Sequence, residues 1–169
     1  MEVVIENKHD GAASESKGEA DSASKELITD AKTLLQSIDA IFALGGEWLE
    51  KKAKLQRVLQ LVDLSTTEGN KYTFFDVEKP YTRNLIGTDN INYSLLLLCW
   101  SPGRESKIHN HPCDGCFIKT LAGCIKETRY EVCTPTNSIT QTATRFYCEG
   151  LSINSFCVLV CTIAYRNSE

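Results

Sequence analysis

The sequence predicts a mainly β protein with helices at its N-terminal side, an α+β arrangement whose strands form a sandwich or small barrel. Two observations support this fold class. Apolar residues recur at helical spacing between residues 25 and 69. From Tyr72 onward the chain consists of short β-rich runs separated by turn residues. The length of 169 residues fits a single domain, because domains usually have ~100–200 residues.

Composition and charge exclude several classes of protein. The apolar fraction of 42% and the charged fraction of 24% are typical of a soluble globular protein. A net charge of −4 provides no basic field, so we expect no binding to nucleic acid or to a membrane. Residues 1–26 contain no apolar signal segment, and the longest apolar run, Phe156–Tyr165, is far shorter than the ~20 residues of a membrane helix. We therefore expect a cytoplasmic protein.

Residues 1–24 read as a disordered tail. Between Asp10 and Ser24 the chain is rich in Gly, Ala, Ser, Glu and Lys and has no aromatic or branched aliphatic residue. Such a segment cannot bury enough apolar surface to offset the entropy lost on ordering. The folded domain is accordingly predicted over residues 25–169, with a helical part at 25–69, a barrel at 70–155 and an atypical tail at 156–169.

The helical part reads as a hairpin of two helices packed on something larger. Gly45-Gly46 is a plausible end for the first helix, because glycine adopts the left-handed conformation found at helix C-termini. The second helix ends near Gly69-Asn70. The apolar face of the first helix consists of Leu27, Ile28, Ala31, Leu34, Leu35, Ile38, Ile41 and Phe42, and that of the second of Trp48, Leu49, Leu55, Val58, Leu59 and Val62.

In the β-rich part, Tyr93–Trp100 is predicted to be a buried strand, bounded by Asn92 and by Pro102-Gly103. Less clean alternation follows at Ile125, Glu127 and Arg129, and residues 134–138 form a turn cluster. The periodicity alone indicates a sandwich or a small barrel and does not distinguish between them.

Eight cysteines are many for a chain of this length. Without a signal peptide a disulfide framework is not expected, because thiols stay reduced in the cytosol. We expect most of the cysteines to be small buried core residues, and we assign that role to Cys99, Cys124 and Cys133.

A candidate metal site lies at His109-Asn110-His111. Residues i and i+2 of a strand point to the same face, so the two imidazoles can bind one metal ion. A His-x-His pair alone is a weak signal. The spacing around it is stronger, because Gly103 precedes His109 by six positions and Gly123 follows position 116 by seven.

This spacing is similar to the first cupin motif, in which position 116 is usually glutamate. Here it is Cys116, as in animal cysteine dioxygenases, and the order of further segments resembles the same family over roughly residues 27–155. These segments are Tyr81-Thr82-Arg83-Asn84-Leu85, Leu98-Cys99-Trp100, Cys116-Phe117 and Lys126-Glu127-Thr128.

The resemblance implies a cupin fold, a small double-stranded β-helix barrel with N-terminal helices. It implies an Fe(2+) enzyme that converts L-cysteine and O2 to cysteine sulfinic acid in cysteine catabolism and taurine biosynthesis, mostly as a monomer. Ferrous iron is held by three histidines in the family, and His109 and His111 match two of them.

Three further residues take roles from the resemblance. Arg83 matches the residue that binds the substrate carboxylate, for which a planar guanidinium provides two parallel hydrogen bonds. Tyr81 matches a residue of the same pocket. Cys116 matches the cysteine that forms a thioether bond to a tyrosine beside the iron. Taken singly, each has a simpler interpretation: a surface arginine, a packing tyrosine and a small buried apolar residue.

The resemblance fails at the C-terminal side. Ile153-Asn154-Ser155 begins the segment that carries the family's third histidine, but the expected position near Val160 holds none, and the third histidine of the chain is His9. From Ser155 onward the sequence does not resemble the family. It therefore predicts a C-terminus that is truncated or altered, without the last barrel strands.

Three alternatives stay open at this point. The chain can be a catalytically inactive isoform that acts at most as a metal- or thiol-binding module. Another residue, such as Glu149, Cys157 or Cys161, can replace the third ligand. The cluster His109-x-His111-x-Cys113-x2-Cys116 can instead bind zinc, although structural zinc sites usually take ligand pairs from two separate segments.

Overall fold

The computed structural model describes residues 2–7, 26–64, 67–109, 115–133, 136, 138–149 and 158–165. Within these residues the helices are α1 (Ala31–Ala43), α2 (Trp48–Leu61) and α3 (Thr67–Asn70). The strands are β1 (Glu2–Asn7), β2 (Tyr81–Thr88), β3 (Tyr93–Trp100), β4 (Gly115–Cys133), β5 (Ser138–Glu149) and β6 (Val158–Tyr165).

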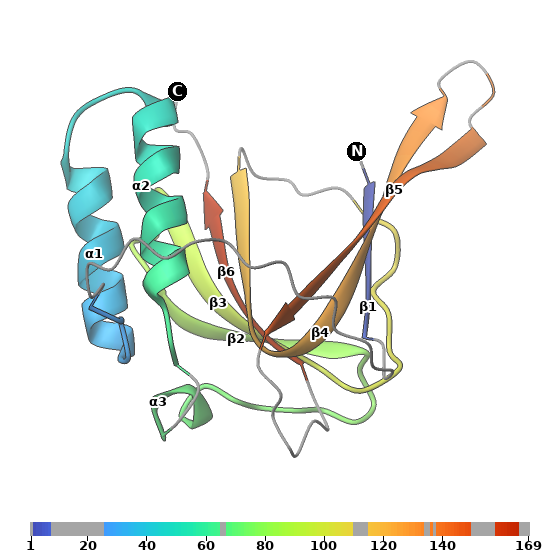
Figure 1. The fold of residues 1–169 in the computed structure, drawn as a ribbon, viewed down its shortest axis with the longest axis horizontal. Helices are drawn as coiled ribbons and strands as arrows, with labels where there is room; N and C mark the ends of the chain where they lie inside the picture. Colours follow the sequence, from blue (N-terminus) through green and yellow to red (C-terminus); the bar gives the residue numbers. More distant parts are fainter. Residues whose placement is uncertain are drawn as a thin grey trace, which may run out of the picture.

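The strands form one curved antiparallel sheet in the order β1-β4-β6-β3-β2, with β5 also paired to β4. Strand β4 belongs to both halves of this sheet. Its residues Gly115–Ala122 pair with β6, whereas Gly123–Cys133 pair with β5. Gly123, at the change of partner, has a φ of 79°, which glycine adopts without steric cost. The β4–β5 hairpin thereby projects away from the helices, as Figure 1 shows.

Helices α1 and α2 form the predicted hairpin, but α2 ends at Leu61 and not near Gly69-Asn70, where the separate helix α3 ends. Helix α1 begins after Asp30, whose carboxylate accepts a hydrogen bond from the backbone N–H of Thr33 at 2.9 Å. This hydrogen bond lowers the pKa of the Asp30 carboxyl. The break between the helices contains Gly46, with a φ of 116°, as the Gly45-Gly46 pair predicts. The buried positions of α1 recur at helical spacing: Ala31, Leu34, Ile38 and Ile41.

The two helices cover one face of the sheet and leave the other face to a separate apolar cluster. Strand β3 is the predicted strand, with the predicted bounds Tyr93–Trp100. On the helix-covered side its alternate residues Leu95, Leu97 and Cys99 pack in the main core with α1 and α2. On the other face, which we call the inner face, Leu98 and Trp100 pack with Tyr81, Leu96, Ile118 and Ile125.

Both ends of the sequence differ from the expectation. Glu2–Asn7, inside the stretch expected to be disordered, form β1 paired with β4, and residues 8–25 lie outside the described residues. Residues 158–165, in the expected atypical tail, form β6 between β3 and β4. Both segments are rich in β-branched residues, Val3-Val4-Ile5 and Val158-Leu159-Val160, which favour strands.

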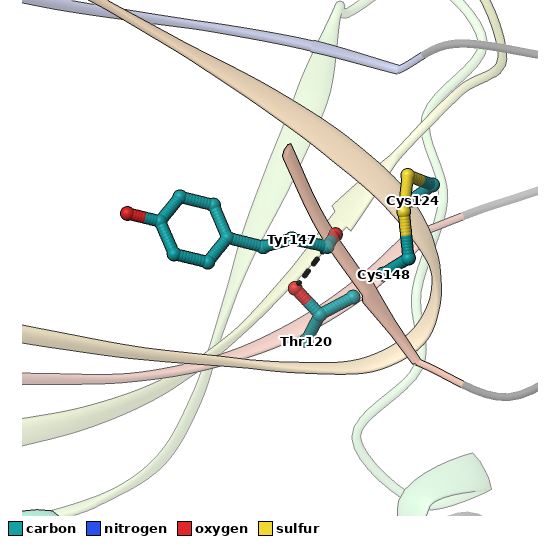
Figure 2. Close-up of a disulfide and its surroundings, with 4 residues drawn as sticks. All are labelled: Thr120, Cys124, Tyr147 and Cys148. Carbon is teal, nitrogen blue, oxygen red and sulfur yellow. Dashed lines mark hydrogen bonds between the residues drawn. A yellow bond between two sulfur atoms is a disulfide. The ribbon is translucent and has the colours of Figure 1, made fainter. Parts of the chain in front are cut away.

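The expectation about the cysteines is corrected at two positions. Cys124 is joined by a disulfide to Cys148, its direct partner across β4 and β5 (Figure 2). Cys133 is exposed near the tip of the same hairpin. Cys99 is buried in the core, as predicted, with 1% of its surface exposed. The pattern of spacing could not reveal the disulfide, because the pairing depends on the register of two strands.

None of the helices in the described part of the chain has both the length and the apolar character that crossing a membrane requires.

The packing of the helices on the sheet predicts that two leucine substitutions lower the free energy of unfolding by unequal amounts. Leu34 is fully buried in the main core, so Leu34→Ala leaves a cavity and should lower the free energy of unfolding by about 2–5 kcal/mol. Leu49 of α2 is 76% exposed, and Leu49→Ala should change it by no more than about 0.5 kcal/mol. Urea denaturation followed by tryptophan fluorescence measures both, and equal losses would contradict this account of the core.

Candidate active site on the inner face of the sheet

Strand β2 directs two pairs of side chains to opposite faces. Tyr81 packs with Trp100 on the inner face, whereas Asn84 contacts Cys99, which belongs to the helix-covered core. Successive residues of a strand alternate between faces, so Arg83 shares its side with Tyr81, and Thr82 shares its side with Asn84. The Tyr-Thr-Arg-Asn segment therefore contributes Tyr81 and Arg83 to the inner face and Thr82 and Asn84 to the helix-covered face.

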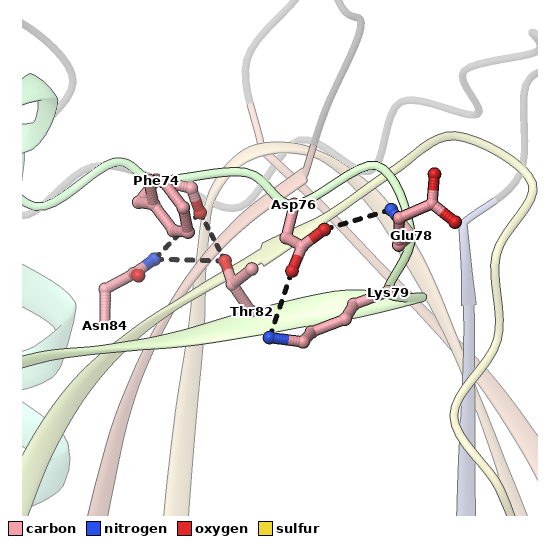
Figure 3. A network of polar contacts seen from close by, with 6 residues as sticks. All are labelled: Phe74, Asp76, Glu78, Lys79, Thr82 and Asn84. Atoms are coloured by element: carbon pink, nitrogen blue, oxygen red, sulfur yellow. Dashed lines mark hydrogen bonds and ion pairs between the residues drawn. The ribbon is translucent and has the colours of Figure 1, made fainter.

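Thr82 and Asn84 fasten the preceding loop to β2 (Figure 3). The Thr82 hydroxyl and the Asn84 side-chain amide both donate to the carbonyl oxygen of Phe74, the amide at 3.2 Å. The same amide lies 3.1 Å from the Cys99 sulfur, and burial raises the pKa of that thiol. Because Thr82 is buried, these bonds hold the start of β2 in place.

The same loop carries its own ion pair. Lys79 Nζ lies 3.0 Å from Asp76, and the other Asp76 oxygen accepts the backbone N–H of Glu78 at 3.1 Å (Figure 3). The hydrogen bond from Lys79 lowers the pKa of the Asp76 carboxyl. Lys79 is exposed and Asp76 is half-buried, so solvent screens the pair, and it shapes the turn before Tyr81 more than it stabilises the fold.

Tyr81 and Arg83, two predicted substrate-binding residues, contact each other. The Arg83 guanidinium donates a hydrogen bond to the Tyr81 hydroxyl at 2.9 Å and lies 5.5 Å from the centre of its ring. The Tyr81 ring in turn stacks on Trp100, with ring centres 4.5 Å apart and planes 19° from parallel. Arg83 stays exposed to solvent while its orientation is set by an aromatic pair.

Cys116 lies on the wall of a small cavity of about 140 Å³, next to the aromatic pair. The apolar lining is Ile118 and Ile125, which also pack against Trp100 on the inner face. The cavity and the Tyr81–Arg83 pair therefore belong to the same side of the sheet. The resemblance implies one pocket for Tyr81, Arg83 and Cys116; Tyr81 and Arg83 do not line this cavity, and their common pocket with Cys116 stays a prediction.

A polar network completes the cavity and was missed from the sequence. The carboxylate of Glu127, which is 8% exposed, accepts from Arg129 Nε at 2.9 Å and from the Tyr147 hydroxyl at 3.2 Å. The hydrogen bond to Glu127 raises the pKa of the Arg129 guanidinium, so the pair is ionic. The alternation of Ile125, Glu127 and Arg129 was visible in the sequence, but nothing indicated that their side faces inward.

His109 has an orientation suited to a metal ligand. Its Nδ1 lies 2.7 Å from the carbonyl oxygen of Lys107, and because a carbonyl only accepts, Nδ1 carries the hydrogen. The lone pair is then on Nε2, the usual arrangement of a histidine that binds a metal through Nε2. His111 lies outside the described residues.

Within the described ranges, no three His, Cys, Asp or Glu side chains are grouped so that they could hold a metal ion. Among the described residues, His109 alone of the two predicted ligands can be judged, and its Nδ1–H leaves Nε2 as the atom that could bind a metal. The His109–His111 pair stays a prediction, as does the pairing on one strand face, because residues 110–114 are not described.

A comparison with known families identifies the family of the chain. The model of the family "Cysteine dioxygenase type I" matches residues 24–149, which is well over half of the chain. A small antiparallel barrel with N-terminal helices is the cupin arrangement, and the described strands form part of one. The chain belongs to the cysteine dioxygenase family and has a cupin fold.

Individual relatives match a shorter segment. "Cysteine dioxygenase type 1" of Rattus norvegicus is 38% identical over 78 residues, 46% of this chain and 38% of the relative. That of Homo sapiens is 38% identical over 77 residues, with the same shares. That of Bos taurus is 35% identical over 97 residues, 57% of this chain and 46% of the relative. The matched part is thus less than half of each relative's own length.

The loop anchor predicts the effect of a nearly isosteric change. Thr82→Val keeps the shape but removes the hydroxyl that donates to Phe74, so the free energy of unfolding should fall by about 1–2 kcal/mol. Thr140→Val, at an exposed position of β5, should change it by less than about 0.5 kcal/mol. Chemical denaturation checks both, and an unchanged Thr82→Val protein would show that the anchor contributes nothing.

Proposed function

We propose that this protein is a non-haem iron thiol dioxygenase that converts L-cysteine and O2 to cysteine sulfinic acid. Membership of the cysteine dioxygenase family supports the reaction class. The observation that carries the proposal is the Tyr81–Arg83 pair on the same inner face as the Cys116 cavity. A cytoplasmic location and a monomeric state are part of the proposal.

Arg83 binds the substrate carboxylate in this proposal. Its guanidinium is exposed, carries a permanent charge and presents a planar fork that matches two carboxylate oxygens. The hydrogen bond to Tyr81 and the stacking of Tyr81 on Trp100 limit its orientations before the substrate arrives. Less conformational entropy is then lost on binding than with an unrestrained arginine.

His109 and His111 would hold the ferrous ion, and the Nδ1 hydrogen bond to the Lys107 carbonyl would leave Nε2 of His109 as the coordinating atom. Bound there, iron would bring the thiol and O2 together and favour the thiolate form of the substrate. Ile118 and Ile125 keep water from this side of the site, because their apolar side chains fill the space between Trp100 and the cavity.

Cys116 lines the wall of the site rather than its exposed mouth. In the proposal Cys116 lies beside the reacting atoms. A thiol is smaller than the glutamate side chain usual at this position, so it leaves room for the substrate. Glu127 and Arg129 neutralise each other on the same wall, so the cavity gains polarity without a net charge.

The activity itself is the first test. The full chain, loaded anaerobically with ferrous iron and then given L-cysteine and air, should form cysteine sulfinic acid, quantified by mass spectrometry. His109→Ala should reduce product formation and bound iron at least about tenfold, the smallest effect expected for a change at a metal site. His9→Ala is the matched control and should leave both unchanged.

The outcomes of this test are distinct. Absence of product from the iron-loaded chain would overturn the dioxygenase proposal and favour the module without turnover. Unchanged product and iron content in the His109→Ala protein would instead remove His109 from the metal site.

The proposed role of Arg83 predicts that its substitution affects only substrates that carry a carboxylate. Arg83→Ala should raise KM for L-cysteine about 10–100-fold with little change in kcat, as expected for the loss of a charge-assisted hydrogen bond worth about 1.5–3 kcal/mol. Cysteamine lacks a carboxylate, so any turnover of cysteamine should not respond to the substitution. Steady-state kinetics with both thiols measures the difference.

Arg57→Ala, an exposed arginine of α2, is the matched control and should leave KM unchanged. A KM for L-cysteine in the Arg83→Ala protein equal to that of the unaltered protein would remove Arg83 from the substrate site. An equal effect on both thiols would show that Arg83 acts on the fold instead.

A further inference from the structure

Cys124 and Cys148 are direct partners across β4 and β5, with Cα atoms 4.0 Å apart and a bond between their sulfurs (Figure 2). We propose that this pair is a reversible oxidation site that controls the wall of the cavity lined by Cys116. The inference concerns the fold and goes beyond the proposed dioxygenase reaction, on which it does not depend.

The disulfide lies where the hairpin is easiest to open. The β4–β5 ladder runs from Gly123↔Glu149 at the open end to Cys133↔Ser138 beside the turn, and Cys124↔Cys148 is the second pair from the open end. Strand ends fray first, because few hydrogen bonds must break together there. The covalent bond therefore closes the end of the ladder that hydrogen bonds hold least well.

The residue beside the disulfide belongs to the Cys116 cavity. Tyr147 precedes Cys148, so its side chain points to the inner face while the disulfide lies on the other face of the hairpin. The Tyr147 hydroxyl donates to Glu127 at 3.2 Å. The backbone carbonyl oxygen of Tyr147 accepts from the Thr120 hydroxyl at 3.4 Å, which is long for a hydrogen bond (Figure 2). With these two long contacts, the position of Tyr147 depends on the pairing of the strand end.

The two sulfurs differ in accessibility, which sets the order of the chemistry. Cys148 is exposed and Cys124 is half-buried. With glutathione disulfide as the oxidant, the Cys148 thiolate attacks one of its sulfurs, forms a mixed disulfide and releases one glutathione thiolate. The Cys124 thiolate then attacks the Cys148 sulfur and releases the second glutathione. The protein loses two protons and two electrons, and glutathione disulfide gains them and becomes two molecules of reduced glutathione; reduction is the reverse.

The two forms should differ locally. In the oxidised form the last rungs stay paired and Tyr147 remains against Glu127, on the cavity wall. In the reduced form the open end frays and Tyr147 leaves this position part of the time. The remaining ladder, up to the turn, stays paired in both forms.

The experiment compares the full chain in reduced glutathione and in glutathione disulfide. Non-reducing peptide mapping by mass spectrometry quantifies the Cys124–Cys148 bond. Hydrogen–deuterium exchange should be about tenfold faster in the reduced form for the amides of residues 147–149, and unchanged for those of residues 140–144. Alkylation of Cys116 by iodoacetamide, mapped by peptide, should also be several-fold faster in the reduced form.

Three variants test the coupling. The double variant Cys124→Ser/Cys148→Ser should behave as the reduced form in both buffers. Cys133→Ser, which alters an exposed cysteine of the same hairpin, should respond to glutathione like the unaltered chain. Tyr147→Phe keeps both cysteines but loses the bond to Glu127, so alkylation of Cys116 should become fast in both buffers.

Failure to form the Cys124–Cys148 bond in glutathione disulfide would overturn the proposal. So would exchange and alkylation rates that do not differ between the two buffers, or a change spread evenly over the whole hairpin. If the double variant does not fold, the two forms of the unaltered chain still decide between these outcomes. None of these measurements uses catalysis, so an inactive enzyme would not affect them.

Discussion

The two-residue period of the strands is the constraint on which both the core and the site depend. Helices α1 and α2 cover one face of the sheet with Leu34, Ile38 and Leu55, all fully buried. Because side chains alternate along a strand, the residues of β2, β3 and β4 between these core positions point to the inner face. A shift of one residue in the register would exchange Leu97 with Leu98 and Tyr81 with Thr82, and would take the site apart together with the core.

The register of β2 on β3 explains why Tyr81 is suited to orient an arginine. Tyr81 pairs with Trp100, and Arg83 pairs with Leu98, so an aromatic stack and an apolar floor lie side by side on the same face. The aromatic stack restricts Tyr81, and Tyr81 restricts Arg83. On the opposite face, Thr82 and Asn84 fix the same strand to Phe74. One short segment thus secures its own position and presents a guanidinium.

Features with a local cause could be predicted from the sequence, and features that depend on strand pairing could not. The helices follow from apolar spacing, and β3 from an uninterrupted apolar run, so both agree with the structure. The Cys124–Cys148 bond and the Glu127–Tyr147 hydrogen bond join residues 24 and 20 positions apart. Their contact depends on the register of β4 and β5, which no periodicity in this sequence specifies.

The candidate site shows the same division. The roles of Arg83, Tyr81 and Cys116 are predictions from a family resemblance, and the structure adds that Tyr81 and Arg83 are in contact. The expectation of disorder at residues 2–7 followed from averaging over a polar tail, which hides a run of three β-branched residues. Composition describes a whole segment, whereas pairing with β4 requires only six suitable residues.

The polar network on the cavity wall depends on the pairing of β4 with β5. A buried carboxylate is costly unless a cation and hydrogen bonds compensate it, and Glu127 has both in Arg129 and Tyr147. Tyr147 reaches Glu127 as a diagonal neighbour across β4 and β5, because Tyr147 pairs with Ile125 and Arg145 pairs with Glu127. The register of β4 and β5 thus places the Glu127–Arg129 ion pair and Tyr147 on the wall of the Cys116 cavity, with the Cys124–Cys148 disulfide directly after Tyr147 in β5.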